Sequence, residues 1–189
     1  MGSYYYLAFG SNLLSLRLQA RTGNVRLIGP VDLHGWRLTF HKRGSDGSGK
    51  GDIVPGTRVD RVFGVLYELD ERQLAVLDEI EGPGYVRDRI EVGCNGRRFR
   101  CMLYRAVAEA IDPTLEPYDW YHQLILAGLL EQGVDADYYD KVRCQNSSPD
   151  PRPRRPARLH ALTVLDQFSA LWPDYAARLH ANQDRTWWE

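Results

Sequence analysis

The first apolar run of the chain, residues 4–9 (YYYLAF), has no charged break and ends at Gly10. An uninterrupted apolar and aromatic run of this length is typical of a buried strand, and the glycine predicts a turn directly after it. Ser11 or Asn12 would then cap a short helix over residues 13–20.

Later segments repeat the strand signal. Residues 35–41 (GWRLTFH) alternate apolar and polar side chains, which is the period of a half-buried strand. Further strand-like runs occupy residues 62–69, 85–92 and 98–106. Residues 42–51 (KRGSDGSGKG) are so rich in glycine, serine and charge that we expect a loop. This loop does not fit the phosphate-binding pattern GxxxxGK[ST], because Gly51 stands at the Ser/Thr position.

Two helices are predicted between and after these strands. Asp70 is a candidate N-cap, with Gln73 three residues later as a capping box requires. This helix has an apolar stripe and a glycine stop: Leu74, Leu77, Ile80 and Gly82. A longer helix over residues 119–132 carries its own stripe: Tyr121, Leu124, Ile125 and Gly128. Strands early and helices late predict an α+β protein with a mixed sheet or small barrel.

The C-terminal quarter changes in composition. Residues 146–158 (NSSPDPRPRRPAR) hold four prolines and four arginines, from which we expect a semi-extended linker or arm with no packed element. It would separate a body of residues 1–145 from a helical extension of residues 159–189. Within that extension, residues 159–171 and 175–181 are predicted to be helices broken at Pro173. Trp187 and Trp188 are candidates for an interaction surface or for packing against the body.

Composition narrows the class of protein. The formal net charge of -1, from 24 basic and 25 acidic residues, indicates no nucleic-acid or membrane partner. No apolar stretch approaches the ~20 residues that span a bilayer, and the start of the chain has no signal-peptide pattern. Three cysteines without CxxC spacing and five histidines without ligand spacing indicate neither a disulfide scaffold nor a metal site. We therefore expect a cytoplasmic monomer without a metal site.

Glu81 is the first candidate for chemistry. It ends the first predicted helix and lies closer to the apolar stripe than Asp78 or Glu79. Burial and the negative end of the helix dipole would raise its pKa, which suits a general acid/base near neutral pH. The alternative is an exposed helix-end glutamate with no role.

The turn at residues 10–13 (GSNL) is the second candidate. Gly10 permits close backbone approach, and successive N–H groups at a helix start can hold a carboxylate or an oxyanion. The alternative is an ordinary strand-to-helix turn, with Ser11 or Asn12 serving only as a cap.

The order and wording of several segments resemble the γ-glutamylcyclotransferase family over about residues 4–140. The matching segments are YLAFGSNL (6–13), FHKRGSDGSGKGDIV (40–54), VFGVLYEL (62–69), LDEIEGPGY (77–85) and EPYDWYHQLILAGLLEQGV (116–134). The resemblance implies a small mixed β-barrel flanked by helices, with the C-terminal helices outside the match. It implies a cofactor-independent enzyme of glutathione metabolism that acts on small γ-glutamyl compounds. In that reaction the α-amine of a γ-glutamyl group attacks its own γ-carbonyl and releases 5-oxoproline and an amine.

The resemblance also assigns roles by position. Glu81 matches the family's general acid/base. The backbone of Gly10, Ser11, Asn12 and Leu13 would hold the glutamyl group, and three tyrosines would line the pocket: Tyr6, Tyr85 and Tyr121. The chain departs from the family pattern at Phe9, Gly44 and Gly51, where tyrosine, serine and alanine are common. A different class of function is a binding or regulatory module that keeps the pocket without turnover, although such a module has no need of Glu81.

Overall fold

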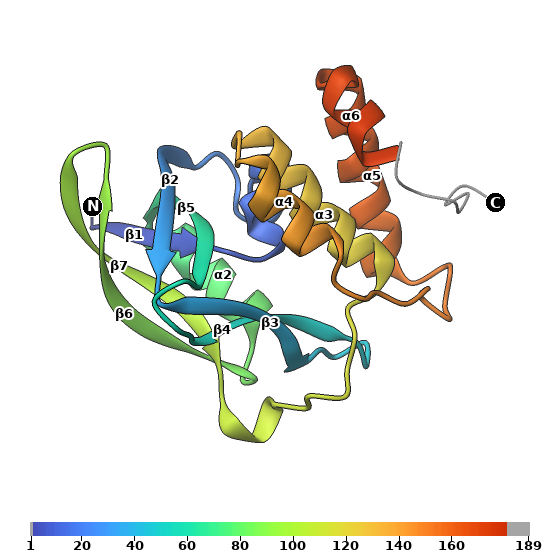
Figure 1. Ribbon diagram of the computed structural model, residues 1–189, viewed down its shortest axis with the longest axis horizontal. Coiled ribbons are helices and arrows are strands. Elements are labelled where there is room, and N and C mark those ends of the chain that lie inside the picture. The colour runs from blue at the N-terminus through green and yellow to red at the C-terminus, as the bar shows by residue number, and fades with distance from the viewer. Residues whose placement is uncertain (1, 181–189) are drawn as a thin grey trace.

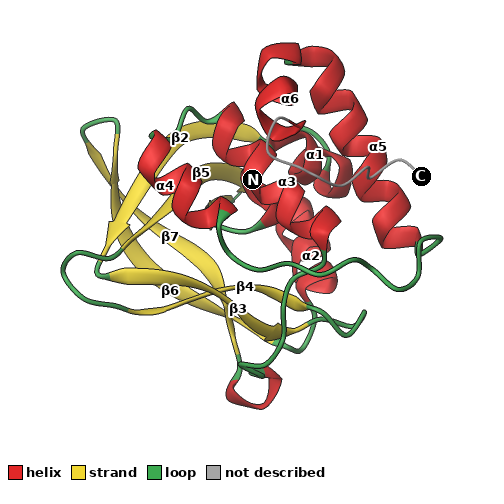
Figure 2. Cartoon of the chain, turned by 45° about the vertical axis from the view of Figure 1, so that its right-hand side comes forward, coloured by secondary structure: helices red, strands yellow, loops and turns green. Residues whose placement is uncertain are grey.

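Five strands form a mixed sheet in the spatial order β2–β5–β1–β7–β6. In the computed structural model, which describes residues 2–180, β1 (Ser3–Ala8) is central. It runs antiparallel to β5 (Arg61–Asp70) and parallel to β7 (Arg97–Ala106). The edges are β2 (Arg26–His34) and β6 (Tyr85–Cys94). Helices cover one side of the sheet (Figures 1 and 2), which confirms the predicted α+β class.

The sheet curls into a half-barrel, so that its two edge strands approach each other at one end. Asn95 follows β6, and its Nδ2 donates a hydrogen bond to the carbonyl of Ile28 on β2 at 2.9 Å. Inside the curl, Tyr6 lies opposite Tyr67 on one side and Met102 on the other. All three side chains are buried, so the second half of the first apolar run is a core strand, as predicted, whereas Tyr4 at its start is 38% exposed.

A separate hairpin of β3 (Trp36–Arg43) and β4 (Gly49–Pro55) packs beside this sheet. The prediction of a loop over residues 42–51 was therefore wrong at both ends, and only residues 44–48 form the turn. Gly49 shows why the glycines of this segment led to the incorrect prediction of a loop. A Cβ there would lie 2.0 Å from the carbonyl oxygen of Phe40, so this glycine permits close strand approach and does not mark flexibility.

The first predicted helix is α2 (Glu71–Glu81), and its start is as expected. The Asp70 carboxylate accepts from the backbone N–H of Gln73, and the Gln73 side chain accepts from the backbone N–H of Asp70. Gly82 ends the helix with φ of 65°, a conformation that favours glycine. One detail was wrong, since Ile80 is 42% exposed instead of buried with Leu74 and Leu77.

The GSNL turn forms a short 3-10 helix, η1 (Ser11–Leu13), followed by α1 (Ser15–Thr22). Neither Ser11 nor Asn12 caps α1, because Leu14 occupies the N-cap position without a side-chain hydrogen bond. Below this turn lies α3 (Asp119–Glu131), which is buried on nearly all sides, so the predicted single stripe was too narrow. Contact is closest at Gly128, where a Cβ would lie 2.4 Å from the backbone nitrogen of Leu14.

Four elements were not predicted: β2, β4, η2 (Ala108–Ala110) and α4 (Ala136–Arg143). β2 contains Gly29 and Pro30 and an irregular register between Leu27 and Gly29. It pairs on one side only, with β5, which is where a sheet tolerates proline.

The Pro/Arg-rich segment is mostly exposed, and Asp150 anchors it to the rest of the protein. Asp150 is buried, accepts a hydrogen bond from Trp120 Nε1 at 3.0 Å and pairs with Arg155. The last residues of the segment begin α5 (Pro156–Leu171), with proline in the first turn, where no N–H is needed. α6 (Pro173–His180) follows. Residue 181 and the tail with Trp187 and Trp188 lie outside the described residues.

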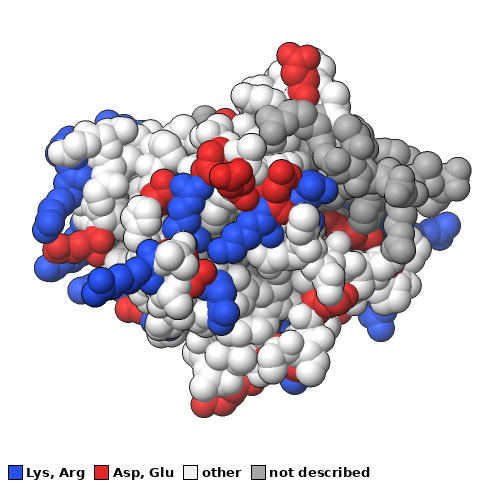
Figure 3. Space-filling model, viewed as in Figure 1, with Lys and Arg blue, Asp and Glu red and all other residues white. Residues whose placement is uncertain are grey.

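Charged side chains of both signs are interspersed over the face in Figure 3. Within residues 2–180, no helix has the length and apolar character needed to cross a membrane. Cys94 and Cys101 are buried free thiols, and burial raises the pKa of Cys101 to about 12.

Candidate active site

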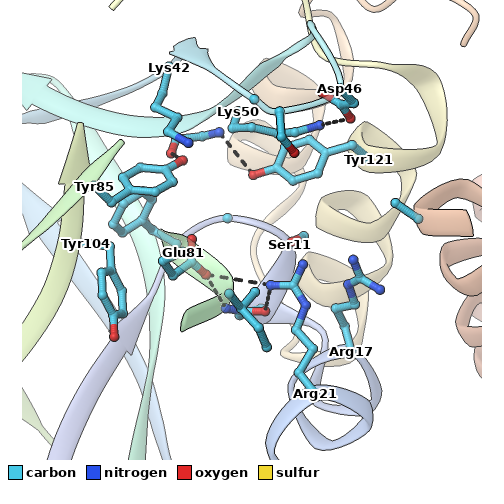
Figure 4. Close-up of a pocket in the computed structure, with 18 of the residues that line it drawn as sticks. Ser11, Arg17, Arg21, Lys42, Asp46, Lys50, Glu81, Tyr85, Tyr104 and Tyr121 are labelled. Atoms are coloured by element: carbon cyan, nitrogen blue, oxygen red, sulfur yellow. Dashed lines mark hydrogen bonds and ion pairs between the residues drawn. The ribbon is translucent and has the colours of Figure 1, made fainter. Parts of the chain in front are cut away.

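A cavity of about 200 Å³ opens between the β3–β4 hairpin, the η1 turn and the C-terminal end of α2 (Figure 4). Of the residues predicted from the sequence, all but one line it: Tyr6, Gly10, Ser11, Asn12, Glu81, Tyr85 and Tyr121. The exception is Leu13, which is 1% exposed and belongs to the core. Its carbonyl accepts a hydrogen bond from Tyr67, so Leu13 supports the turn from behind and does not face the cavity.

Glu81 lies in the wall of this cavity, and 16% of its side chain is exposed. Its Oε1 accepts a hydrogen bond from Asn12 Nδ2 at 3.3 Å and lies 3.6 Å from Arg21 Nη1. Burial raises the pKa of Glu81 above the ordinary carboxyl value, although Arg21, Lys42 and Asn12 act to lower it. This burial argues against the alternative of an exposed glutamate at a helix end.

Asn12 connects Glu81 to two further groups. The same Nδ2 donates to Tyr6 Oη at 3.0 Å, and Asn12 Oδ1 accepts from Arg21 Nη1 at 3.0 Å. The amide therefore turns its donor side toward Tyr6 and Glu81. Burial, and next the charge of Glu81, raise the pKa of Tyr6, so its hydroxyl stays protonated.

Two tyrosines and two glycines fix the other wall. Tyr85 Oη donates to the carbonyl of Gly51 at 2.6 Å, and the Gly51 N–H donates to Tyr121 Oη at 3.0 Å. A Cβ at Gly10 or at Gly51 would lie 3.1 or 3.3 Å from the same Tyr121 oxygen. The glycines thus let the hairpin and the η1 turn approach that hydroxyl from two sides.

Four basic residues that line the cavity were missed from the sequence: Arg17, Arg21, Lys42 and Lys50. Lys50 Nζ pairs with Asp46 at 2.7 Å and lies 4.7 Å from the centre of the Tyr121 ring. The signals were present in the sequence. Arg17 and Arg21 are four residues apart in one helix and so share a face, and Lys42 continues the alternation of the strand at residues 36–40.

The described part of the chain has no group of three His, Cys, Asp or Glu side chains placed to share a metal ion. His41 pairs with Asp52 at 2.8 Å, and Asp52 also accepts from the backbone N–H of Ala106. This pair joins the hairpin to β7 and serves the fold.

Comparisons with known proteins agree with this architecture. Residues 61–142 match the model of the AIG2-like family. Human γ-glutamylcyclotransferase is 28% identical over 156 residues, which cover 75% of this chain and 78% of the relative. Bovine γ-glutamylaminecyclotransferase is 37% identical over 84 residues, which cover 42% of this chain and 45% of that protein. A solved γ-glutamyl cyclotransferase superposes with a TM-score of 0.75 at 22% identity, over 89% of this chain and 99% of that structure.

The fold and the site define a small α+β protein whose half-barrel carries a pocket lined by two largely buried carboxylates, Glu81 and Asp46. In sequence the chain is similar to γ-glutamylcyclotransferases, and it has the fold of the solved γ-glutamyl cyclotransferase.

Proposed function

We propose that the chain is a γ-glutamyl cyclotransferase with Glu81 as its general acid/base. The observation that carries this proposal is the placement of Glu81, a buried carboxyl of raised pKa in the wall of a small cavity. A carboxyl whose pKa lies nearer neutrality is a better proton acceptor than an exposed one and still ionises. Such a group in a pocket of polar donors suits proton transfer on a small substrate.

The proposed reaction is intramolecular, and its atoms balance without a co-reactant. Glu81 takes a proton from the substrate's α-ammonium, and the freed amine attacks the γ-carbonyl carbon to form the ring C–N bond. The original amide C–N bond then breaks, and Glu81 gives its proton to the departing nitrogen. The attacking nitrogen loses a second proton as it becomes the lactam N–H, and this proton also passes to the departing amine, which leaves as an ammonium ion. The products are 5-oxoproline and a free amine or amino acid, so the proposal requires no metal or organic cofactor.

The pocket's part in this reaction is mainly positional. We propose that the backbone of Gly10, Ser11 and Asn12 holds the glutamyl group, with the tyrosine walls restricting it to a curled conformer. Holding the amine and carbonyl in reacting geometry can supply up to ~7–11 kcal/mol of the barrier in the best cases. One acid/base residue typically adds a factor of ~10²–10⁴.

The test is 5-oxoproline release, followed by chromatography, from γ-glutamyl amino acids, γ-glutamylamines and glutathione. Release from at least one class supports the proposal. If none of them yields 5-oxoproline while calorimetry shows that the same compounds bind, the chain is a binding module that retains the pocket.

A further inference from the structure

The charges that line the cavity do not cancel within the protein. Two of the four cations have carboxylate partners, since Arg21 pairs with Glu81 and Lys50 pairs with Asp46. Among residues 2–180, neither Arg17 nor Lys42 has a carboxylate at ion-pair distance. Arg17 instead contacts the imidazole of His160.

Lys42 is held in place despite lacking an anionic partner. The residue is 7% exposed, and its Nζ lies 4.3 Å from the centre of the Tyr85 ring. Behind it, a Cβ at Gly84 would lie 2.7 Å from Lys42 Cε and 2.9 Å from Nζ. The ring of Tyr85 and the absence of a side chain at Gly84 together position the Lys42 ammonium at the cavity wall.

Glu81 and Asp46 favour the charged form of Lys42 only from beyond ion-pair distance, and burial still lowers its pKa. A ligand carboxylate in contact with Nζ would offset this remaining cost of burial. The free cations lie at opposite ends of the site. In Figure 4, Lys42 lies on the hairpin side of Glu81, and Arg17 lies on the α1 side. A γ-glutamyl group brings one carboxylate, which the η1 turn and α1 would hold. Lys42 then remains for a second carboxylate across Glu81.

We propose that Lys42 is a specificity-determining residue that binds a carboxylate on the leaving part of the substrate. The preferred substrates are then γ-glutamyl α-amino acids, and γ-glutamylamines that lack this carboxylate are poor ones. The inference rests on the proposed function and deepens it. It also distinguishes this chain's specificity from the γ-glutamylaminecyclotransferase activity named for one of its relatives.

The test uses two compounds that differ only in this group, γ-glutamyl-L-alanine and γ-glutamylethylamine. The quantity measured is the ratio of their kcat/KM values for 5-oxoproline release. A charge-assisted contact predicts a ratio of roughly tenfold to a hundredfold in favour of the alanine compound. Lys42→Met should bring the ratio close to one, mainly through the KM of the alanine compound, and Lys42→Arg should retain most of it.

Gly84→Ala provides a second variant that leaves every charge in place. Its Cβ would displace the end of the flexible Lys42 side chain and should lower the same ratio. A wild-type ratio near one would overturn the proposal. Equal losses on both compounds in Lys42→Met would do the same, because Lys42 would then act through Glu81.

Failure of the proposed function can be distinguished from failure of the Lys42 proposal. If neither compound yields 5-oxoproline, the same pair is compared by calorimetric binding to the wild type and Lys42→Met. A preference for the alanine compound that is lost in the variant would still support Lys42 as a carboxylate site, and equal binding would refute it.

Discussion

The side-chain amide of Asn12 lies 3.3 Å from the carboxylate of Glu81, 69 residues later in the chain. One hydrogen bond thereby joins the GSNL turn to the end of α2. The same amide contacts Tyr6 and Arg21. Asn12 therefore positions the Glu81 carboxylate and also the Arg21 guanidinium beside it.

Asn12→Ala should lower kcat by roughly tenfold to a hundredfold, because a hydrogen bond to a charged group is worth about 1.5–3 kcal/mol. Steady-state kinetics on the best substrate measures this loss, and circular dichroism checks the fold. An unchanged kcat would show that Glu81 needs no orientation by Asn12.

Activity should fall as the pH is lowered through the pKa of Glu81, since the carboxylate must be free to accept the substrate's proton. Burial raises that pKa, so the acidic limb of kcat/KM should lie above the ordinary carboxyl range. Arg21 is the largest of the influences that lower it, and Arg21→Gln should move the limb to higher pH. A limb that stays in place in this variant would contradict the assigned electrostatics.

Gly51→Ala should reduce kcat/KM, because the new Cβ would meet Tyr121 Oη at 3.3 Å and Gly10 Cα at 3.6 Å. Tyr121→Phe removes the hydroxyl and relieves the crowding. In a double-mutant cycle, the combined variant should therefore lose less than the sum of the two single losses. Additive losses would mean that Gly51 and Tyr121 act independently.

Gly128→Ala should destabilise the fold by at least ~2 kcal/mol, at the upper end of overpacked cores, since its Cβ would press on the backbone of Leu13 and Leu14. Urea unfolding measures this. Gly93→Ala is the matched control, because its Cβ would meet no atom within 4 Å. Similar unfolding midpoints for the two variants would refute close packing of α3 beneath the η1 turn.

Local patterns were sufficient to predict some elements. The capping box of Asp70 and Gln73 and the glycine stop at Gly82 depend on residues within one helix, so their geometry could be predicted from spacing. The first strand could also be predicted from local sequence, because residues 4–8 are all apolar or aromatic and residues 6–8 are buried. The predicted division into residues 1–145, 146–158 and 159–189 stays a prediction.

Other features depend on contacts between distant residues. Gly49 and Gly51 indicate a loop when taken alone, whereas both are strand residues that permit close backbone approach. From the sequence alone, Asp150 is predicted to be part of a polar linker. In the fold, its carboxylate accepts hydrogen bonds from Trp120 and Arg155. Lys42 was missed for a related reason, because a prediction of loop concealed its position on the inward face of β3.

Glu81→Gln tests the central claim most directly, with γ-glutamyl-L-alanine as substrate and calorimetric binding measured on the same preparation. The raised pKa means that the carboxyl's contribution to stability is present at low pH and is lost as the pH rises through that pKa. The variant should therefore be at least as stable as the wild type at neutral pH, which removes misfolding as an explanation. We predict that it binds the compound but releases 5-oxoproline at least ~10²-fold more slowly. Release at the wild-type rate would contradict the assignment of Glu81 as the general acid/base.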